Sequence, residues 1–87
     1  MAFTVLLTKT AVKAYNKTSG KLKLGIDRCL LSLQVNPLLG AGIKRLKGHS
    51  GCYRYQIGGL RLIYEVHEDL LDVRVYSIRP RGDVYKH

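Results

Sequence analysis

Cysteine is scarce in this sequence of 87 residues, and its two positions match no familiar motif. Cys29 and Cys52 are far apart, without the close Cys–Cys or Cys–His spacing of a zinc site. Two cysteines also make no disulfide framework of the kind that staples small secreted domains. We therefore expect two buried free thiols, no metal and no cofactor.

Long apolar runs are absent as well. No stretch approaches the roughly 20 apolar residues that a membrane-spanning helix needs. The first ten residues, MAFTVLLTKT, have no basic segment before an apolar one, so they do not resemble a secretion signal. We expect one cytoplasmic domain over residues 1–87 that does not enter a membrane.

Acidic residues are few. Six Asp and Glu stand against fifteen Lys and Arg, which gives a net charge of +9. Basic residues occur in both halves of the chain, so the excess belongs to the fold and not to a detachable tail. A charge of this size favours a polyanionic partner. Nucleic acid, an acidic protein and an anionic membrane surface all remain open at this point.

Common catalytic signatures are missing too. Ser77 has no flanking glycines of a nucleophile elbow, and no GxGxxG or GxxxxGK loop is present to hold a nucleotide. Cys52 follows His49 closely, but a cysteine that opens a strand is more often a small core residue. Four of the six acids lie within residues 65–72, where a solvated turn is the simpler interpretation. Nucleotide hydrolysis is unsupported.

What is present is a pattern of strands and helices. Residues 3–8 alternate apolar side chains with threonine, as in a short strand. Thr8 or Thr10 then caps a first helix that ends near Lys17. A second helix begins at Lys21 and ends at Asn36–Pro37. Its apolar residues fall on one helical face: Leu22, Ile26, Cys29, Leu30 and Leu33.

Three strand patterns follow, over residues 52–57, 60–66 and 70–78. Gly58–Gly59 suits a tight hairpin turn, because glycine accepts positive φ, and residues 67–69 make the next turn. The order β-α-α-β-β-β predicts an α+β fold, a mostly antiparallel sheet with a helical hairpin packed on one face.

Strand alternation separates aromatic from basic residues. If Tyr53, Tyr55, Leu62 and Tyr64 face the helices, then Arg54, Gln56 and Arg61 lie on the opposite face. Arginine's planar group matches a phosphate, and several together can stabilise a phosphorane-like transition state. RNA needs no metal for cleavage, because its own 2′-hydroxyl can attack the neighbouring phosphate. The basic residues that support this chemistry are Lys44, Arg45, Lys47, Arg54, Arg61, Arg79 and Arg81.

Two stretches, KRLKGHSGCYRYQIGGLRLIYEVHED and VRVYSIRPRGDVYKH, resemble the RelE/ParE superfamily of bacterial and archaeal toxins. The resemblance implies the toxin of a type II toxin–antitoxin pair, with the fold predicted above. RelE-like members cut mRNA in the ribosomal A site without metal, leaving a 2′,3′-cyclic phosphate and a 5′-hydroxyl. The resemblance further implies a cognate antitoxin and a toxin–antitoxin hetero-oligomer.

The resemblance assigns roles by motif position. Arg54 matches a residue that binds the substrate backbone, and Arg61 the arginine that stabilises the transition state. Arg79 matches the arginine that protonates or neutralises the leaving group, and Tyr85 a tyrosine that stacks on or orients the substrate. Arg81 is a secondary match. The residues that fit a segment docking on ribosomal RNA are Lys44, Arg45 and Lys47.

Gln56 departs from this pattern. The best-known RelE branch has a lysine there, often assigned as general base, and a neutral amide takes up a proton poorly. Either Tyr85 or His87 then supplies the base, or the enzyme is slow.

Two other functions stay open. A ParE-type toxin that inhibits DNA gyrase shares the fold and lacks the catalytic residues, whereas Arg61, Arg79 and Tyr85 together favour RelE. The other is a non-catalytic basic module that acts only as co-repressor with its antitoxin. In either toxin, we expect an acidic antitoxin segment to cover the basic sheet face, with Leu38, Leu39 and Ile63 nearby.

Overall fold

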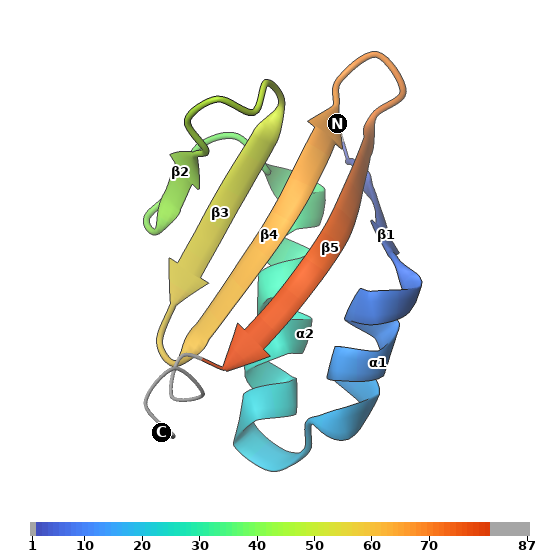
Figure 1. The fold of residues 1–87 in the computed structure, drawn as a ribbon, viewed down its shortest axis with the longest axis vertical. Coiled ribbons are helices and arrows are strands. Elements are labelled where there is room, and N and C mark those ends of the chain that lie inside the picture. Colours follow the sequence, from blue (N-terminus) through green and yellow to red (C-terminus); the bar gives the residue numbers. More distant parts are fainter. Residues whose placement is uncertain (1, 81–87) are drawn as a thin grey trace.

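Five strands form one sheet, and two helices pack against one of its faces, in the computed structural model, which describes residues 2–80 (Figure 1). The strand order is β1-β5-β4-β3-β2, with β1 parallel to β5 and every other pair antiparallel. This arrangement confirms the predicted α+β class. The elements are β1 (Thr4–Leu7), α1 (Lys9–Lys17), α2 (Gly20–Val35), β2 (Ile43–Arg45), β3 (Cys52–Ile57), β4 (Leu60–His67) and β5 (Asp72–Pro80).

Local sequence signals set both helices. The Thr8 side chain accepts a hydrogen bond from the Ala11 backbone N–H at 3.3 Å and so caps α1. Helix α2 ends at Val35, and its C-cap Asn36 stands immediately before Pro37. The Tyr15 hydroxyl donates to Asp27 at 2.7 Å and ties the two helices together. The predicted helical hairpin is therefore confirmed.

The core lies between the helices and the sheet. Strand β4 alternates strictly, with Leu60, Leu62, Tyr64 and Val66 buried. Tyr64 is fully buried, and its hydroxyl donates to the Pro37 carbonyl at 2.7 Å, which satisfies its polar atom. Burial raises the pKa of this phenol. Packing of β4 under α2 thus fixes which face of the sheet stays uncovered.

Two strand predictions need correction. Residues 43–45 form the short edge strand β2, which the sequence pattern did not predict. Strand β5 covers residues 72–80 and not 70–78, because Leu71 adopts a left-handed conformation (φ 53°) inside the preceding turn. Because of this shift, Arg79 lies within β5, where it pairs with Arg61 on β4, and not beyond the end of the strand.

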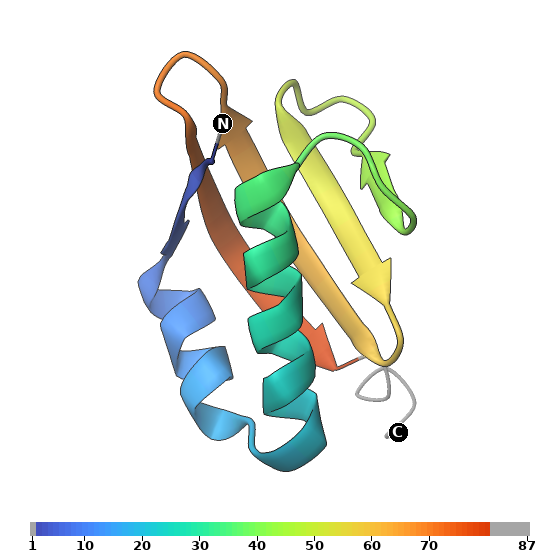
Figure 2. The ribbon, with the colours of Figure 1, turned by 180° about the vertical axis from the view of Figure 1, so that it is seen from behind.

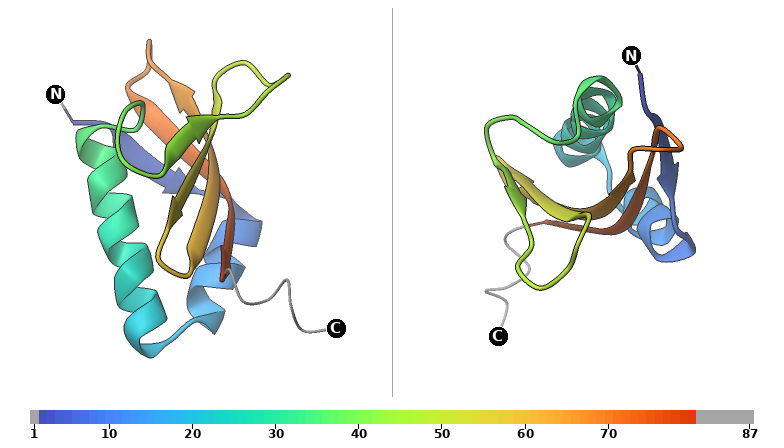
Figure 3. Two further views of the ribbon diagram at one scale, coloured as in Figure 1. Left: turned by 90° about the vertical axis from the view of Figure 1, so that its left-hand side faces the viewer. Right: turned by 90° about the horizontal axis from the view of Figure 1, so that it is seen from above.

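The second face of the sheet carries no helix. The view from behind shows both helices in front of the sheet (Figure 2), and the view from above shows the sheet curving around α2, with α1 at the end of the sheet that carries β1 (Figure 3). Neither helix in residues 2–80 has the length and apolar character that a bilayer crossing requires. Side chains of alternate strand residues are left exposed on this uncovered face.

Candidate functional site

One row of the uncovered face joins Gln56, Arg61 and Arg79. Gln56 on β3 is the direct cross-strand partner of Arg61 on β4, which in turn partners Arg79 on β5. All three lie opposite the buried side of their strands, and both arginines are exposed. Direct partners have Cβ atoms about 5 Å apart, so two guanidinium groups can reach one phosphate. The structure thus brings together two of the predicted catalytic residues and Gln56.

A second row runs beside the first. Lys44 on β2 partners Arg54 on β3, and Arg54 partners Ile63 on β4. Lys44, Arg54 and Gln56 also line a shallow hollow of about 330 Å³. Within residues 2–80, the buried Arg54 Nε atom has no hydrogen-bond partner. A donor in this state favours an acceptor from outside the chain, such as a phosphate oxygen.

The four cations of these rows are Lys44, Arg54, Arg61 and Arg79. The ion pairs of the described residues are His67–Glu65 and Arg74–Asp72, so none of the four has an acidic partner among residues 2–80. Like charges placed directly opposite each other destabilise a sheet. A sheet that opposes two such pairs on one face is suited to binding an anion.

Gly42 sets the position of the edge strand that carries Lys44. Its φ is 87°, and its carbonyl accepts a hydrogen bond from the Gln56 N–H at 2.9 Å. A side chain here would place its Cβ 2.3 Å from the Gln56 carbonyl oxygen. Only glycine allows this close approach, which holds β2 against β3.

The predicted basic segment does not act as one surface. Lys44 lies on the uncovered face, whereas Arg45 partners Tyr53 and shares its side of the sheet. Lys47 lies in the loop between β2 and β3, where it lines a hollow of about 490 Å³ together with His49. Strand alternation divides residues that are adjacent in sequence.

Three predicted site residues fall outside the described part of the chain. They are Arg81, Tyr85 and His87, and their assignment remains a prediction. Among residues 2–80, no three His, Cys, Asp or Glu side chains gather to hold a metal ion. Both cysteines are free; Cys29 is buried as expected, whereas Cys52 is only half-buried.

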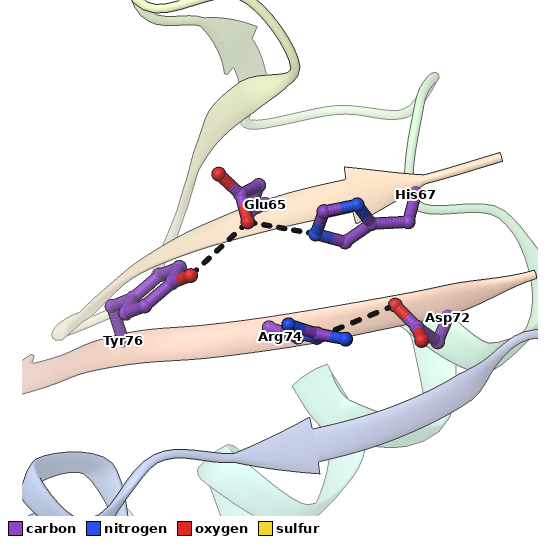
Figure 4. A network of polar contacts seen from close by, with 5 residues as sticks. All are labelled: Glu65, His67, Asp72, Arg74 and Tyr76. Atoms are coloured by element: carbon purple, nitrogen blue, oxygen red, sulfur yellow. Dashed lines mark hydrogen bonds and ion pairs between the residues drawn. The ribbon is translucent and has the colours of Figure 1, made fainter. Parts of the chain in front are cut away.

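The far half of the uncovered face holds a polar network that the sequence reading missed (Figure 4). The Tyr76 hydroxyl donates to Glu65 Oε1 at 3.0 Å, and His67 Nε2 lies 2.7 Å from the same oxygen. The hydrogen bonds from His67 and Tyr76 lower the pKa of Glu65, and the same carboxylate raises the pKa of Tyr76. The sequence suggested a solvated turn for Glu65 and its neighbouring acids and gave no role to Tyr76. The spacing of Glu65 and His67 on alternate strand positions was the available signal.

The helix side of the sheet has a groove of its own, about 490 Å³ in volume. Leu22 was predicted to be buried but is 40% exposed, and it lines this groove with Ile57. Lys21 and Arg28 also line it. Of the apolar residues expected near the basic face, Ile63 lies on it, whereas Leu38 packs against the core. Leu39 is exposed in the segment after α2.

Comparisons with known proteins agree with this geometry. Residues 4–85 match the family described as "ParE toxin of type II toxin-antitoxin system, parDE". Toxin RelE3 of Methanocaldococcus jannaschii is 32% identical, over 95% of this chain and 96% of the relative. The isolated Escherichia coli RelE toxin superposes with a TM-score of 0.79 at 25% identity, covering 97% of this chain and 92% of that one.

Two solved toxin–antitoxin complexes contain the same fold. The RelBE2 complex of Mycobacterium tuberculosis gives a TM-score of 0.82 at 22% identity, covering 93% of this chain and 100% of that one. The archaeal RelE–RelB complex of Pyrococcus horikoshii gives 0.80 at 23%, covering 94% and 98%.

Proposed function

The chain belongs to the RelE/ParE toxin superfamily of type II toxin–antitoxin systems, and from this membership we propose that it is a ribosome-dependent endoribonuclease. The proposed substrate is mRNA in the ribosomal A site. Cleavage needs no metal and stops translation until a cognate antitoxin neutralises the toxin. The observation that carries the proposal is the Arg61–Arg79 pair on the uncovered face.

Arg61 and Arg79 would act on the scissile phosphate. Attack by the 2′-hydroxyl places extra negative charge on the phosphate oxygens in the transition state. Two fixed guanidinium groups stabilise this transition state more than they stabilise the ground state, which lowers the activation barrier for cleavage. Arg79 also neutralises the leaving 5′-oxygen.

Arg54 and Lys44 would hold the RNA backbone beside this phosphate, at the hollow that they line. Gln56 can accept or donate a hydrogen bond there but makes a poor base. We assign proton removal from the 2′-hydroxyl to Tyr85 or His87, and substrate contact to Tyr85 and Arg81. Arg45 and Lys47 are proposed to contact ribosomal RNA.

The test is to incubate the protein with translating ribosomes and map the 5′ ends of the mRNA. We expect cuts within A-site codons that leave a 5′-hydroxyl. The absence of such cuts, together with loss of DNA gyrase supercoiling activity, would overturn the proposal.

That outcome would favour the second candidate, a ParE-like inhibitor of gyrase. The matching family model is named for ParE, which keeps this function open. An inhibitor of gyrase has no need of the opposed arginines, so Arg61→Gln would leave its toxicity intact. A non-catalytic co-repressor would inhibit neither ribosomes nor gyrase.

An antitoxin is the proposed protein partner, in a toxin–antitoxin hetero-oligomer. The Pyrococcus horikoshii relative was crystallised with RelB. An acidic segment with apolar anchors suits both the basic sheet face and the groove beside α2, where Lys21 and Arg28 flank apolar residues. Because ribosomes are its proposed target, we place the protein in the cytoplasm.

A further inference from the structure

Tyr76 occupies an irregular position in β5. The register slips by one residue here, because Ile63 pairs with Ser77 while Tyr64 pairs with Val75. Tyr76 therefore has no partner on β4. A bulge of this kind redirects a side chain and is common beside functional sites. Tyr76 is 41% exposed, although it is one of the larger apolar side chains of the chain.

The ring is held in place at its hydroxyl end. Glu65 Oε1 accepts from the Tyr76 hydroxyl at 3.0 Å, and His67 Nε2 lies 2.7 Å from that oxygen (Figure 4). Arg74 lies on the same strand as Tyr76 and pairs with Asp72 at 3.8 Å. An aromatic ring fixed at its polar end and exposed elsewhere is suited to contact with a flat partner.

Tyr76 lies next to the basic rows of the uncovered face. Ser77, the next residue, is in the row that contains Ile63, Arg54 and Lys44. Rows on one face of a sheet are about 7 Å apart, two residues along a strand. Tyr76 precedes Ser77 in the bulge, and its hydroxyl reaches Glu65 of the next row, so it lies between these two rows, on the side away from Arg61 and Arg79.

We propose that Tyr76 is a stacking platform for an unpaired RNA base near the cleaved phosphate. Glu65, oriented by His67, positions the ring. This inference rests on the RNA substrate of the proposed function and adds a base-binding site to its phosphate-binding rows. Single-stranded RNA is commonly recognised by bases that stack on aromatic side chains beside a basic surface.

The local charge favours a base over a phosphate at this point. The Glu65 carboxylate beside the ring accepts hydrogen bonds from the N–H groups of a base edge. Its cross-strand partner Arg74 is already paired with Asp72 at 3.8 Å, so a phosphate is held less strongly here than at the basic rows. The backbone then follows the cations of the neighbouring rows, while one base turns toward Tyr76. Charge and shape thus divide the face into a phosphate half and a base half.

A tryptophan reporter tests the stacking directly, because the natural sequence has no tryptophan. Tyr76→Trp is compared with Val12→Trp, which puts the same probe at an exposed site of α1, among the helices on the covered side of the sheet. Each full-length variant is titrated with a single-stranded 2′-O-methyl oligoribonucleotide, which binds but cannot be cut. We expect quenching in Tyr76→Trp and none in Val12→Trp.

Affinity gives an independent measurement. Tyr76→Ile keeps a good strand residue but loses the ring, and it should bind the oligonucleotide about tenfold more weakly. Tyr76→Phe keeps the ring and should stay within about twofold of wild type. If Tyr76→Ile fails to fold, the tryptophan and phenylalanine variants decide the question.

Equal emission changes in the two tryptophan variants, unchanged affinity of Tyr76→Ile, or no binding by the wild type would overturn the inference. The proposed function is judged separately, by cleavage on ribosomes. A protein that quenches on the oligonucleotide but cuts no mRNA would retain the base site and lose the proposed function.

Discussion

Arg61 and Arg79 are direct cross-strand partners on the face of the sheet that no helix covers. Two positive side chains opposed in this way repel each other, and residues 2–80 supply no carboxylate to either. The fold holds them together through the buried alternate residues of the same strands, Leu62 and Ile78. A bound phosphate would relieve the repulsion, and this relation underlies the proposed chemistry.

Lys44 and Arg45 offer a matched pair for mapping the RNA path, because both are exposed and adjacent but lie on opposite sides of β2. Each phosphate contact contributes about −0.7 to the slope of log K against log salt for a single strand. We expect Lys44→Gln to reduce the slope by about this amount and Arg45→Gln to leave it unchanged. Equal effects on oligonucleotide binding would contradict the assigned faces.

Gln56 is the position where a base can be added. A lysine there would be surrounded by Arg54 and Arg61, and neighbouring cations lower the pKa of an amine toward the range useful in catalysis. We expect Gln56→Lys to raise the single-turnover cleavage rate by about tenfold or more. The control is Gln56→Arg, which adds the charge but cannot take up a proton. Equal rates in both variants would exclude a base effect.

Alanine substitutions at Gly42 and Gly59 test how closely the edge strand β2 packs against β3. Gly42→Ala would force a Cβ to within 2.3 Å of the Gln56 carbonyl oxygen, at a φ of 87°. We expect its free energy of unfolding to fall by about 2 kcal/mol or more. Gly59 has open space around it, so Gly59→Ala should change this value by less than about 1 kcal/mol. Urea denaturation measures both, and equal losses would contradict the close approach.

Glu65 should give the protein an acid-sensitive contribution to stability. The hydrogen bond from His67, then that from Tyr76, holds the pKa of Glu65 below its ordinary value of 4.5, and Arg74 acts in the same direction. Its contribution is therefore complete above pH 4.5 and is lost as the pH falls through the lower, folded-state pKa.

The measurement is the difference in free energy of unfolding between wild type and Glu65→Gln, followed from pH 7 down to pH 3. We expect the difference to be constant at neutral pH and to shrink below pH 4.5. A difference that grows as the pH falls below 4.5 would contradict the hydrogen-bonded carboxylate.

Much of the fold follows from periodicity in the sequence. Alternation in residues 52–66 and the Gly58–Gly59 turn predicted the central hairpin, whose register then followed. The edge strand β2 was missed because three residues are too short to show alternation. The start of β5 was missed because Leu70 and Leu71 have the composition of a strand but lie in the turn. Only the backbone conformation of Leu71 separates the two cases.

The part of the site that strand alternation alone determines was predictable from the sequence. Alternation alone placed Arg54, Gln56 and Arg61 on one face, and the structure confirms it. The split between Lys44 and Arg45 required the unexpected strand β2. The exposure of Tyr76 required the bulge, because regular alternation after Val75 gives no reason to single it out.

The most direct test of the central claim is single-turnover cleavage of an mRNA held in the ribosomal A site. The double variant Arg61→Gln/Arg79→Gln removes the opposed pair, and Lys13→Gln removes an exposed charge on α1 as control. We expect the double variant to cut at least about a hundredfold more slowly, while Lys13→Gln cuts at the wild-type rate. Cleavage by the double variant at the wild-type rate would show that the opposed pair is not catalytic.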